Sequence, residues 1–130
     1  MSEKFSIEII NPDSTILKSE TTEVIIPAFE GLMTILKNHI SLVTFLRPGF
    51  IAVKLNNKLE KFYIEEGTVE FSHNKLLILS STVKNINDFA REEARKILDR
   101  SKKLMITGNL KDKDKYILSY KVSALEEITQ

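Results

Sequence analysis

The sequence contains no cysteine, only two histidines and only four glycines, and these shortages exclude several kinds of functional site. Without cysteine, neither a disulfide framework nor thiol chemistry is available. His39 and His73 are far apart, which argues against a zinc site, and no Ser or Cys near His39 sits in a recognisable nucleophile context that would make it a catalytic base. The glycines are isolated from one another, which excludes a P-loop and a dinucleotide-binding fingerprint. We therefore expect no catalytic residue, no metal site and no required cofactor.

The chain also lacks an excess of charge and any long apolar run. Nineteen basic and 18 acidic residues give a formal net charge of +1, so no overall field favours nucleic acid or an acidic membrane. The longest apolar runs, such as residues 76–79, fall far short of the ~20 residues that span a bilayer. Residues 1–4 do not begin a secretion signal. We expect an intracellular protein that does not bind nucleic acid.

The first two-thirds of the sequence alternate between apolar and polar residues. This period of two, typical of strands, is clear at residues 5–9 and 51–55 and continues to about Val83. Polar segments at 56–57 and 72–74 predict tight hairpin turns, and all three prolines precede residue 50. The pattern predicts a mainly β fold with an antiparallel β-sandwich, or flattened barrel, at the N-terminus.

The remaining residues have helical periodicity. One helix is predicted from Asp88 to about Met105, with a stop signal at Gly108, and a second from Asp112 to about Ile128. The predicted domains are therefore a sandwich at 1–84 and a helical hairpin at 85–130. Two helices of about 16–18 residues cannot form a core of their own. The hairpin must pack on the sandwich, on another subunit, or on each in turn.

The first predicted helix has an apolar stripe that includes small residues and has basic residues on both borders. The stripe comprises Ala90, Ala94, Ile97, Leu98, Ser101, Leu104 and Met105. The basic residues are Arg91, Arg95, Lys96, Arg100, Lys102 and Lys103. Such a helix suits close packing on a partner with acidic groups. It equally suits a solvated amphipathic helix whose long basic side chains lie beside its own core.

Residues 30–49 carry the most specific pattern in the chain. An acidic-Gly turn at Glu30-Gly31 is followed eight residues after the glycine by His39, then by an apolar run and by Arg47-Pro48-Gly49. Five apolar residues between the turns are predicted to share a buried face: Met33, Ile35, Ile40, Leu42 and Phe45. In order and spacing the segment resembles the ε subunit of F-type ATP synthases, called δ in mitochondria.

Other parts of the chain match the same family. Residues 5–12 are similar to its first strand and polar turn, and residues 63–67 are similar to its strand–Gly–strand corner. With the helical hairpin, the resemblance covers essentially all 130 residues. The chain departs from the family at Thr34, where Gly is usual, at Lys37-Asn38, where Pro-Gly is common, and at Ser41, where Pro is common.

The resemblance implies a non-catalytic rotor subunit of the central stalk. The sandwich would bind the γ subunit and the c-ring through residues on one side: Glu30, Gly31, Leu32, Met33, His39, Ser41 and Leu42. The hairpin would reach the α and β subunits of the catalytic head and restrain ATP hydrolysis. Its predicted contact residues are Arg91, Arg95, Arg100, Lys102 and Lys103. Such a subunit would be monomeric when isolated and peripheral on the cytoplasmic face of the inner membrane.

A short motif at the start of the first predicted helix has two interpretations. Residues 88–91 resemble the Asp-x-x-Arg core of the ATP-binding motif of some bacterial ε subunits, which would make Asp88 and Arg91 a weak site for regulatory ATP. Alternatively, Asp88 caps the helix and pairs with Arg91 three residues later. Asn87 and Glu92 depart from the family motif, and the second helix contains no Arg.

A different class of protein is also compatible with this organisation. A free-standing β-sandwich interaction module could dimerise through its helical hairpin. Such a module would be dimeric alone and would not bind ATP synthase subunits. Sedimentation of the isolated chain separates the two hypotheses.

Overall fold

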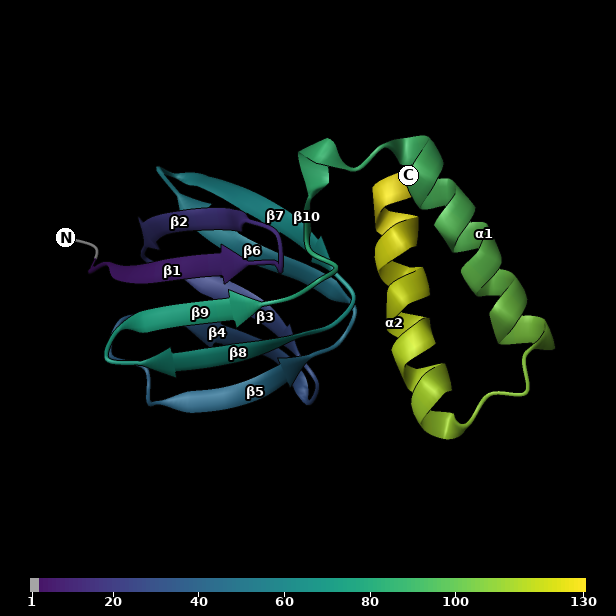
Figure 1. The fold of residues 1–130 in the computed structure, drawn as a ribbon, viewed down its shortest axis with the longest axis horizontal. Coiled ribbons are helices and arrows are strands. Elements are labelled where there is room, and N and C mark those ends of the chain that lie inside the picture. Colours follow the sequence, from purple (N-terminus) through teal and green to yellow (C-terminus); the bar gives the residue numbers. More distant parts are fainter. Residues whose placement is uncertain (1–2) are drawn as a thin grey trace.

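The computed structural model describes residues 3–130, and it consists of a curled β-sheet followed by two helices (Figure 1). The strands are β1 (Phe5–Ile10), β2 (Thr15–Thr21), β3 (Val24–Ala28), β4 (Gly31–Ile35), β5 (Leu42–Leu46), β6 (Gly49–Leu55), β7 (Lys58–Ile64), β8 (Gly67–Ser72), β9 (Lys75–Leu79) and β10 (Lys84–Asn85). A 3-10 turn η1 (Ile86–Asp88) leads into α1 (Arg91–Thr107) and α2 (Asp112–Thr129). The predicted sandwich followed by a helical hairpin is confirmed.

The sheet folds over on itself because β3 belongs to both of its halves. The strand order is β10-β7-β6-β3-β5-β8-β9-β1-β2, and β4 pairs with β3. Val24 of β3 is paired with Val53 of β6, whereas Ala28 is paired with Leu46 of β5. On the opposite side, the buried Thr21 donates its hydroxyl to the Lys54 carbonyl at 2.7 Å. Within residues 3–130 the pairings are antiparallel except that of β1 with β9.

Two predicted hairpin turns form as expected. Asn56 and Asn57, between β6 and β7, both have positive φ, at 48° and 66°. His73 and Asn74, between β8 and β9, have φ of 51° and 57°. Two-residue turns of this kind match the right-handed twist of antiparallel strands, and Asn tolerates the left-handed region. The turns therefore fix the register of both hairpins.

The apolar residues form two clusters, one inside the sandwich and one beneath the helices. The first is built from inward-facing residues of the strands, such as Ile7, Ile26 and Phe71. The second joins Tyr63 of β7 to residues of the hairpin: Phe89, Ala94, Leu98, Ala124 and Leu125. In Figure 1, α2 lies between the sandwich and α1. The hairpin is therefore docked on the sandwich mainly through α2.

The start of the first helix differs from the prediction. Asn85 accepts a hydrogen bond from the Asn87 backbone N–H, which stabilises the 3-10 turn, and α1 begins only at Arg91. Phe89 instead packs on Tyr63, with ring centroids 5.2 Å apart. A short side-chain-to-backbone hydrogen bond and a distant aromatic partner therefore override the helical pattern. Helix α1 stops before Gly108, as predicted.

The apolar stripe of α1 is buried over only part of its length. Ala94, Leu98 and Ser101 are buried against α2. Leu104 and Met105 are 47% and 38% exposed, near the loop where α1 and α2 diverge in Figure 1. The predicted stripe is therefore buried between Ala94 and Ser101, whereas Ala90 at its start and Leu104 and Met105 at its end are exposed.

Candidate functional site: an exposed apolar segment and a docked hairpin

Most of the exposed large apolar residues of the sandwich lie in one segment. Among residues 3–84, five of the seven are Leu32, Leu36, Ile40, Val43 and Phe45, with exposed fractions of 70%, 50%, 79%, 73% and 63%; the others are Leu59 and Leu79. We call the stretch containing these five the 32–45 segment. It comprises β4, β5 and the loop between them. Apolar side chains concentrated in this way are typical of an interaction surface.

The predicted buried face of this segment is partly wrong. Ile35 is fully buried, and Met33 and Leu42 pack against the sandwich core, as predicted. Ile40 and Phe45 are exposed. In β5 the strand period places Leu42, Thr44 and Leu46 on the inner side, so Phe45 must point outward.

The predicted partner-binding residues of the sandwich lie within or beside this segment. Glu30 and Ser41 are exposed, and Gly31 has a φ of 145°, a conformation that favours glycine. His39 is half-buried, its ring edge-on to Phe71 with centroids 5.9 Å apart. Its Nδ1 lies 2.8 Å from the Ile40 carbonyl oxygen. The predicted partner-binding residues are therefore close in the sequence to the exposed apolar side chains of the 32–45 segment.

Two tyrosines of α2 hold the hairpin to the end of the sandwich. The Tyr116 hydroxyl donates to the Phe29 carbonyl at 2.7 Å, and the two rings lie 5.5 Å apart. One helical turn later, the Tyr120 ring covers the Arg47 guanidinium, with Cζ 3.7 Å from the ring centroid. We call these four residues the tyrosine clasp. The sequence analysis did not identify it, although the i,i+4 tyrosine pair on one predicted helix was a visible signal.

Arg47 is buried at this contact. It is 8% exposed, and its Nη1 donates to the Pro48 carbonyl at 3.0 Å. Its Nε has no hydrogen-bond partner among residues 3–130. A buried charge is costly unless compensated, and here the π face of Tyr120 provides part of the compensation.

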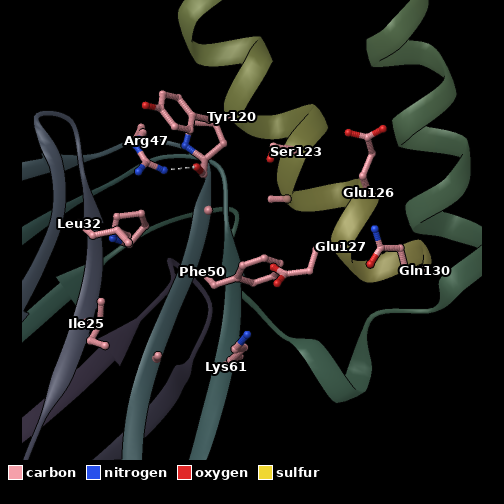
Figure 2. Close-up of a pocket in the computed structure, with 15 residues that line it drawn as sticks. Ile25, Leu32, Arg47, Phe50, Lys61, Tyr120, Ser123, Glu126, Glu127 and Gln130 are labelled. Carbon is pink, nitrogen blue, oxygen red and sulfur yellow. Dashed lines mark hydrogen bonds between the residues drawn. The ribbon is translucent and has the colours of Figure 1, made fainter.

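An open cleft of about 680 Å³ lies beside Arg47, between the sandwich and α2 (Figure 2). Its lining includes two cations, Arg47 and Lys61, and two carboxylates, Glu126 and Glu127. With both signs present, the cleft has no strong preference for an anion or a cation.

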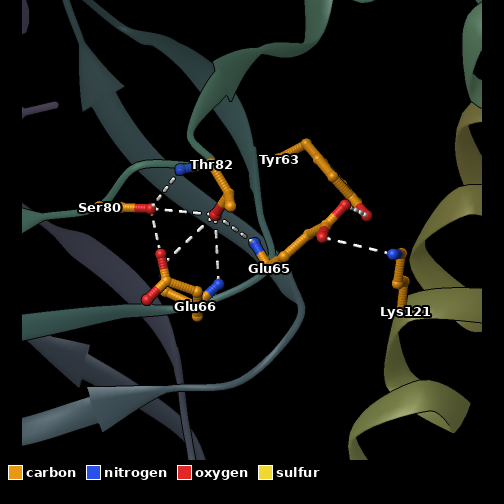
Figure 3. Close-up of polar contacts among 6 residues, drawn as sticks. All are labelled: Tyr63, Glu65, Glu66, Ser80, Thr82 and Lys121. Carbon is orange, nitrogen blue, oxygen red and sulfur yellow. Dashed lines mark hydrogen bonds and ion pairs between the residues drawn. The ribbon is translucent and has the colours of Figure 1, made fainter. Parts of the chain in front are cut away.

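A second polar contact joins the hairpin to β7. Lys121 of α2 lies 3.4 Å from Glu65, whose other carboxylate oxygen accepts the Tyr63 hydroxyl at 2.9 Å (Figure 3). Burial raises the pKa of Tyr63, and the charge of Glu65 and its hydrogen bond raise it further. Tyr63 therefore remains a neutral donor that orients Glu65 toward Lys121.

The corner that carries Glu65 is fixed by its own hydrogen bonds. Thr82 Oγ1 accepts the backbone N–H groups of Glu65 and Glu66 at 3.0 and 3.2 Å. Ser80 donates its hydroxyl to the Glu66 carbonyl at 2.6 Å. A Cβ on Gly67 would lie 2.8 Å from the Leu79 carbonyl oxygen, so only glycine fits. This explains the strand–Gly–strand corner noted in the sequence.

The predicted hairpin contacts are on the exposed surface of α1. These residues are Arg91, Arg95, Arg100, Lys102 and Lys103. Lys102 pairs with Glu126 of α2 at 3.3 Å. Within the described residues, Arg95, Arg100 and Lys103 form no ion pair. Their charges are therefore available at the protein surface.

Arg91 and Asp88 do not pair with each other. Arg91 Nε and Nη2 both donate to the Thr129 carbonyl, at 3.1 and 2.6 Å, which ties the start of α1 to the end of α2. Asp88 lies in η1, and the ion pairs found in residues 3–130 do not include one between it and Arg91. The predicted helix cap and i,i+3 pair are therefore wrong.

Residues 3–130 contain neither a metal-binding cluster nor a membrane-spanning helix. This part of the chain brings no three His, Asp or Glu side chains together as a metal site. Neither of its long helices has the apolar length needed to cross a membrane.

Comparison with known proteins identifies relatives over the whole chain. The sequence model described as "ATP synthase, Delta/Epsilon chain, beta-sandwich domain" matches residues 4–86. The ATP synthase epsilon chain of Pelagibacter ubique is 39% identical over 129 residues, which cover 98% of this chain and 99% of the relative. That of Allorhizobium ampelinum is 27% identical over 103 residues, 78% and 76% of the two chains.

Solved structures share the fold. A chain of the Euglena gracilis mitochondrial ATP synthase aligns with a TM-score of 0.74 at 17% identity, covering 95% of this chain and 78% of that one. A chain of the Tetrahymena thermophila ATP synthase central stalk and c-ring aligns with a TM-score of 0.63 at 17% identity, covering 99% and 98%. At this identity the two structures establish the shared fold alone.

These matches confirm the resemblance drawn from residues 30–49. They also confirm the prediction of a non-catalytic subunit, since the curated relatives are epsilon chains. The sandwich, the helical hairpin and the sequence match over nearly the full length agree, and the chain belongs to the ATP synthase delta/epsilon family.

Proposed function

We propose that the chain is a non-catalytic rotor subunit that binds the γ subunit and the c-ring through the 32–45 segment. The observation that carries this proposal is the exposure of Leu32, Leu36, Ile40, Val43 and Phe45 with the hairpin docked on the sandwich. An apolar centre with polar neighbours such as Glu30 and Ser41 is typical of protein–protein interfaces. The subunit transmits torque from the c-ring to the γ subunit, which couples proton flow to ATP synthesis, and catalyses no reaction itself.

The location follows from these partners. A subunit held by γ and the c-ring is peripheral, on the cytoplasmic face of the inner membrane. We further propose that residues 1–84 and 85–130 act as separate units, the first for assembly and the second for regulation.

The proposed role of the hairpin is to restrain ATP hydrolysis by contacting the α and β subunits. Three exposed cations of α1, Arg95, Arg100 and Lys103, have no ion pair in residues 3–130 and suit acidic groups on a partner. The hairpin docks through a modest set of side chains with two alanines among them. A competing surface can therefore displace it.

Regulatory ATP would bind at Asp88 and Arg91. Arg91 has its Nε and Nη2 donors on the Thr129 carbonyl. A phosphate would have to replace that contact, so we propose that any nucleotide binding is weak. Titration calorimetry with ATP tests this, and micromolar affinity would contradict it.

The main test is calorimetric titration of the γ subunit from the same organism. We expect one-to-one binding, weakened at least about tenfold by the double substitution Val43→Ser with Phe45→Ser, because exposed apolar anchors dominate interfaces. Leu59→Ser is the matched control, since Leu59 is 54% exposed but lies outside the segment. No detectable binding at micromolar concentration would overturn the proposal. A dimer in sedimentation would favour the free-standing module.

A further inference from the structure

The turn between β3 and β4 touches both the docked hairpin and the 32–45 segment. Ala28 and Gly31 are paired across it, so the turn itself is Phe29 and Glu30. The Phe29 N–H donates to the Phe45 carbonyl at 2.9 Å, and the Phe29 carbonyl accepts the Tyr116 hydroxyl at 2.7 Å. One residue of the sandwich thus connects β5, the β3–β4 turn and α2.

Besides the Ala28–Gly31 pair and the Phe29 N–H bond to Phe45, few contacts fix the conformation of the turn. Glu30 is exposed, and the next residue, Gly31, has a φ of 145° with no atom within 4 Å of where a Cβ would be. A glycine in open space retains backbone freedom. The Tyr116 hydroxyl is therefore well placed to order this turn.

Hairpin docking and exposure of the segment are compatible. Leu32, Val43 and Phe45 are 70%, 73% and 63% exposed with α2 in place. A partner can reach them without removing the hairpin, so the hairpin and the partner do not compete for these side chains. If hairpin docking and partner binding both favour the same ordered turn, each increases the affinity of the other by the same factor.

We propose that the hydrogen bond from Tyr116 to Phe29 links hairpin docking to partner binding, so that each strengthens the other. This inference rests on the proposed function for its partner, the γ subunit. A docked hairpin orders the β3–β4 turn before the partner arrives. A bound partner in turn holds the hairpin on the sandwich.

The test compares two single substitutions in the full chain. Tyr116→Phe removes the hydroxyl and keeps the ring beside Phe29. The matched control is Lys121→Gln, which removes the ion pair between α2 and Glu65 of the sandwich and does not touch the turn. For each protein, amide hydrogen exchange of Phe29 and NMR order parameters of Glu30 and Gly31 are measured, followed by calorimetric affinity for γ.

In Tyr116→Phe the Phe29 N–H keeps its bond to the Phe45 carbonyl, but the turn loses the bond to its own carbonyl and should open more readily, so we expect Phe29 exchange up to about fivefold faster. We also expect lower order parameters in the turn and up to about fivefold weaker binding of γ. Lys121→Gln loses one partly exposed ion pair and keeps the Tyr116 hydrogen bond, so its effect on all three should be much smaller. If the unsubstituted chain binds γ, the linkage would be overturned by unchanged Phe29 exchange in Tyr116→Phe, or by equal effects of the two substitutions. Failure of the unsubstituted chain to bind γ would overturn the proposed function and with it the partner half of the linkage.

Discussion

The face of the Tyr120 ring lies 3.7 Å from the guanidinium carbon of Arg47, and this contact joins the hairpin to a buried cation of the sandwich. Arg47 is 8% exposed and its Nε lacks a hydrogen-bond partner in residues 3–130. Its stabilisation in the docked state depends on Tyr120 and on the Pro48 carbonyl. Undocking α2 would remove the contact with Tyr120, so the free energy of burying the Arg47 charge depends on the position of the hairpin.

Replacing Tyr120 should weaken hairpin docking. Tyr120→Ala removes the π face from Arg47 together with buried ring area, and we expect a loss of about 1–2 kcal/mol of docking free energy. Because the chain has no cysteine, Lys75→Cys and Asn109→Cys, both at exposed positions, provide labelling sites for distance measurement by energy transfer. A broader or longer distance distribution in Tyr120→Ala is the expected result.

The control for this measurement is Ser119→Ala. Ser119 is exposed, lies on the same helix and donates its hydroxyl only to the helix carbonyl of Tyr116. It should leave the distance distribution unchanged. Identical distributions for Tyr120→Ala and the unsubstituted chain would show that the clasp does not hold the hairpin.

Tyr63 should make stability fall at alkaline pH. Its pKa is raised above the ordinary value of 10.0 by burial and then by Glu65, so the folded protein retains a proton that the unfolded chain releases. The contribution is fully present below pH ~10 and is lost as pH rises further, at about 1.4 kcal/mol per pH unit. Urea unfolding between about pH 9 and 11 measures this slope.

Tyr63→Phe isolates that contribution. The substitution removes the titrating group and the hydrogen bond to Glu65, at a cost of about 1 kcal/mol near neutral pH. Above pH ~10 its stability should fall less steeply than that of the unsubstituted chain. Parallel slopes for the two proteins would contradict the assignment.

The sequence predicted those parts of the fold that depend on local patterns. The two-residue turn at Asn56-Asn57 needed only residues that tolerate positive φ, and both have it. The start of α1 was wrong because Phe89 packs on Tyr63, which is distant in the sequence. Phe45 was assigned to the wrong side of its strand because apolar character alone does not fix the phase of the alternation.

The candidate site likewise contains residues that the sequence predicted and residues that it did not. Glu30, Leu32 and Ser41 were predicted from the family resemblance; all three are exposed, Leu32 and Ser41 within the 32–45 segment and Glu30 beside it. The tyrosine clasp was not predicted, because Tyr116 and Phe29 are separated by 87 residues and meet only when the hairpin docks. Contacts between separately folded elements are not encoded in the periodicity of either element.

The corner at Gly67 should not tolerate a side chain. In Gly67→Ala the new Cβ would lie 2.8 Å from the Leu79 backbone carbonyl, so β8 or β9 must shift. We expect a loss of about 1–3 kcal/mol in the free energy of unfolding, measured in urea. Thr68→Ala, at an exposed neighbouring position, should cost far less. Equal losses for the two variants would show that the corner is adaptable.

Charge reversal on α1 tests whether the hairpin restrains ATP hydrolysis in the assembled complex. The triple substitution Arg95→Glu, Arg100→Glu, Lys103→Glu changes exposed residues that form no ion pair in the part of the chain described. It replaces attraction to acidic groups of the catalytic head by repulsion, and we expect hydrolysis to rise severalfold, more at low salt because exposed charges are screened. Steady-state hydrolysis of the reconstituted complex is the measurement.

The matched control reverses three exposed lysines of the sandwich, Lys54, Lys58 and Lys75, and should leave hydrolysis unchanged. An unchanged rate in the α1 variant, with assembly intact, would mean that these cations do not hold the hairpin on the head and that any restraint comes from another surface.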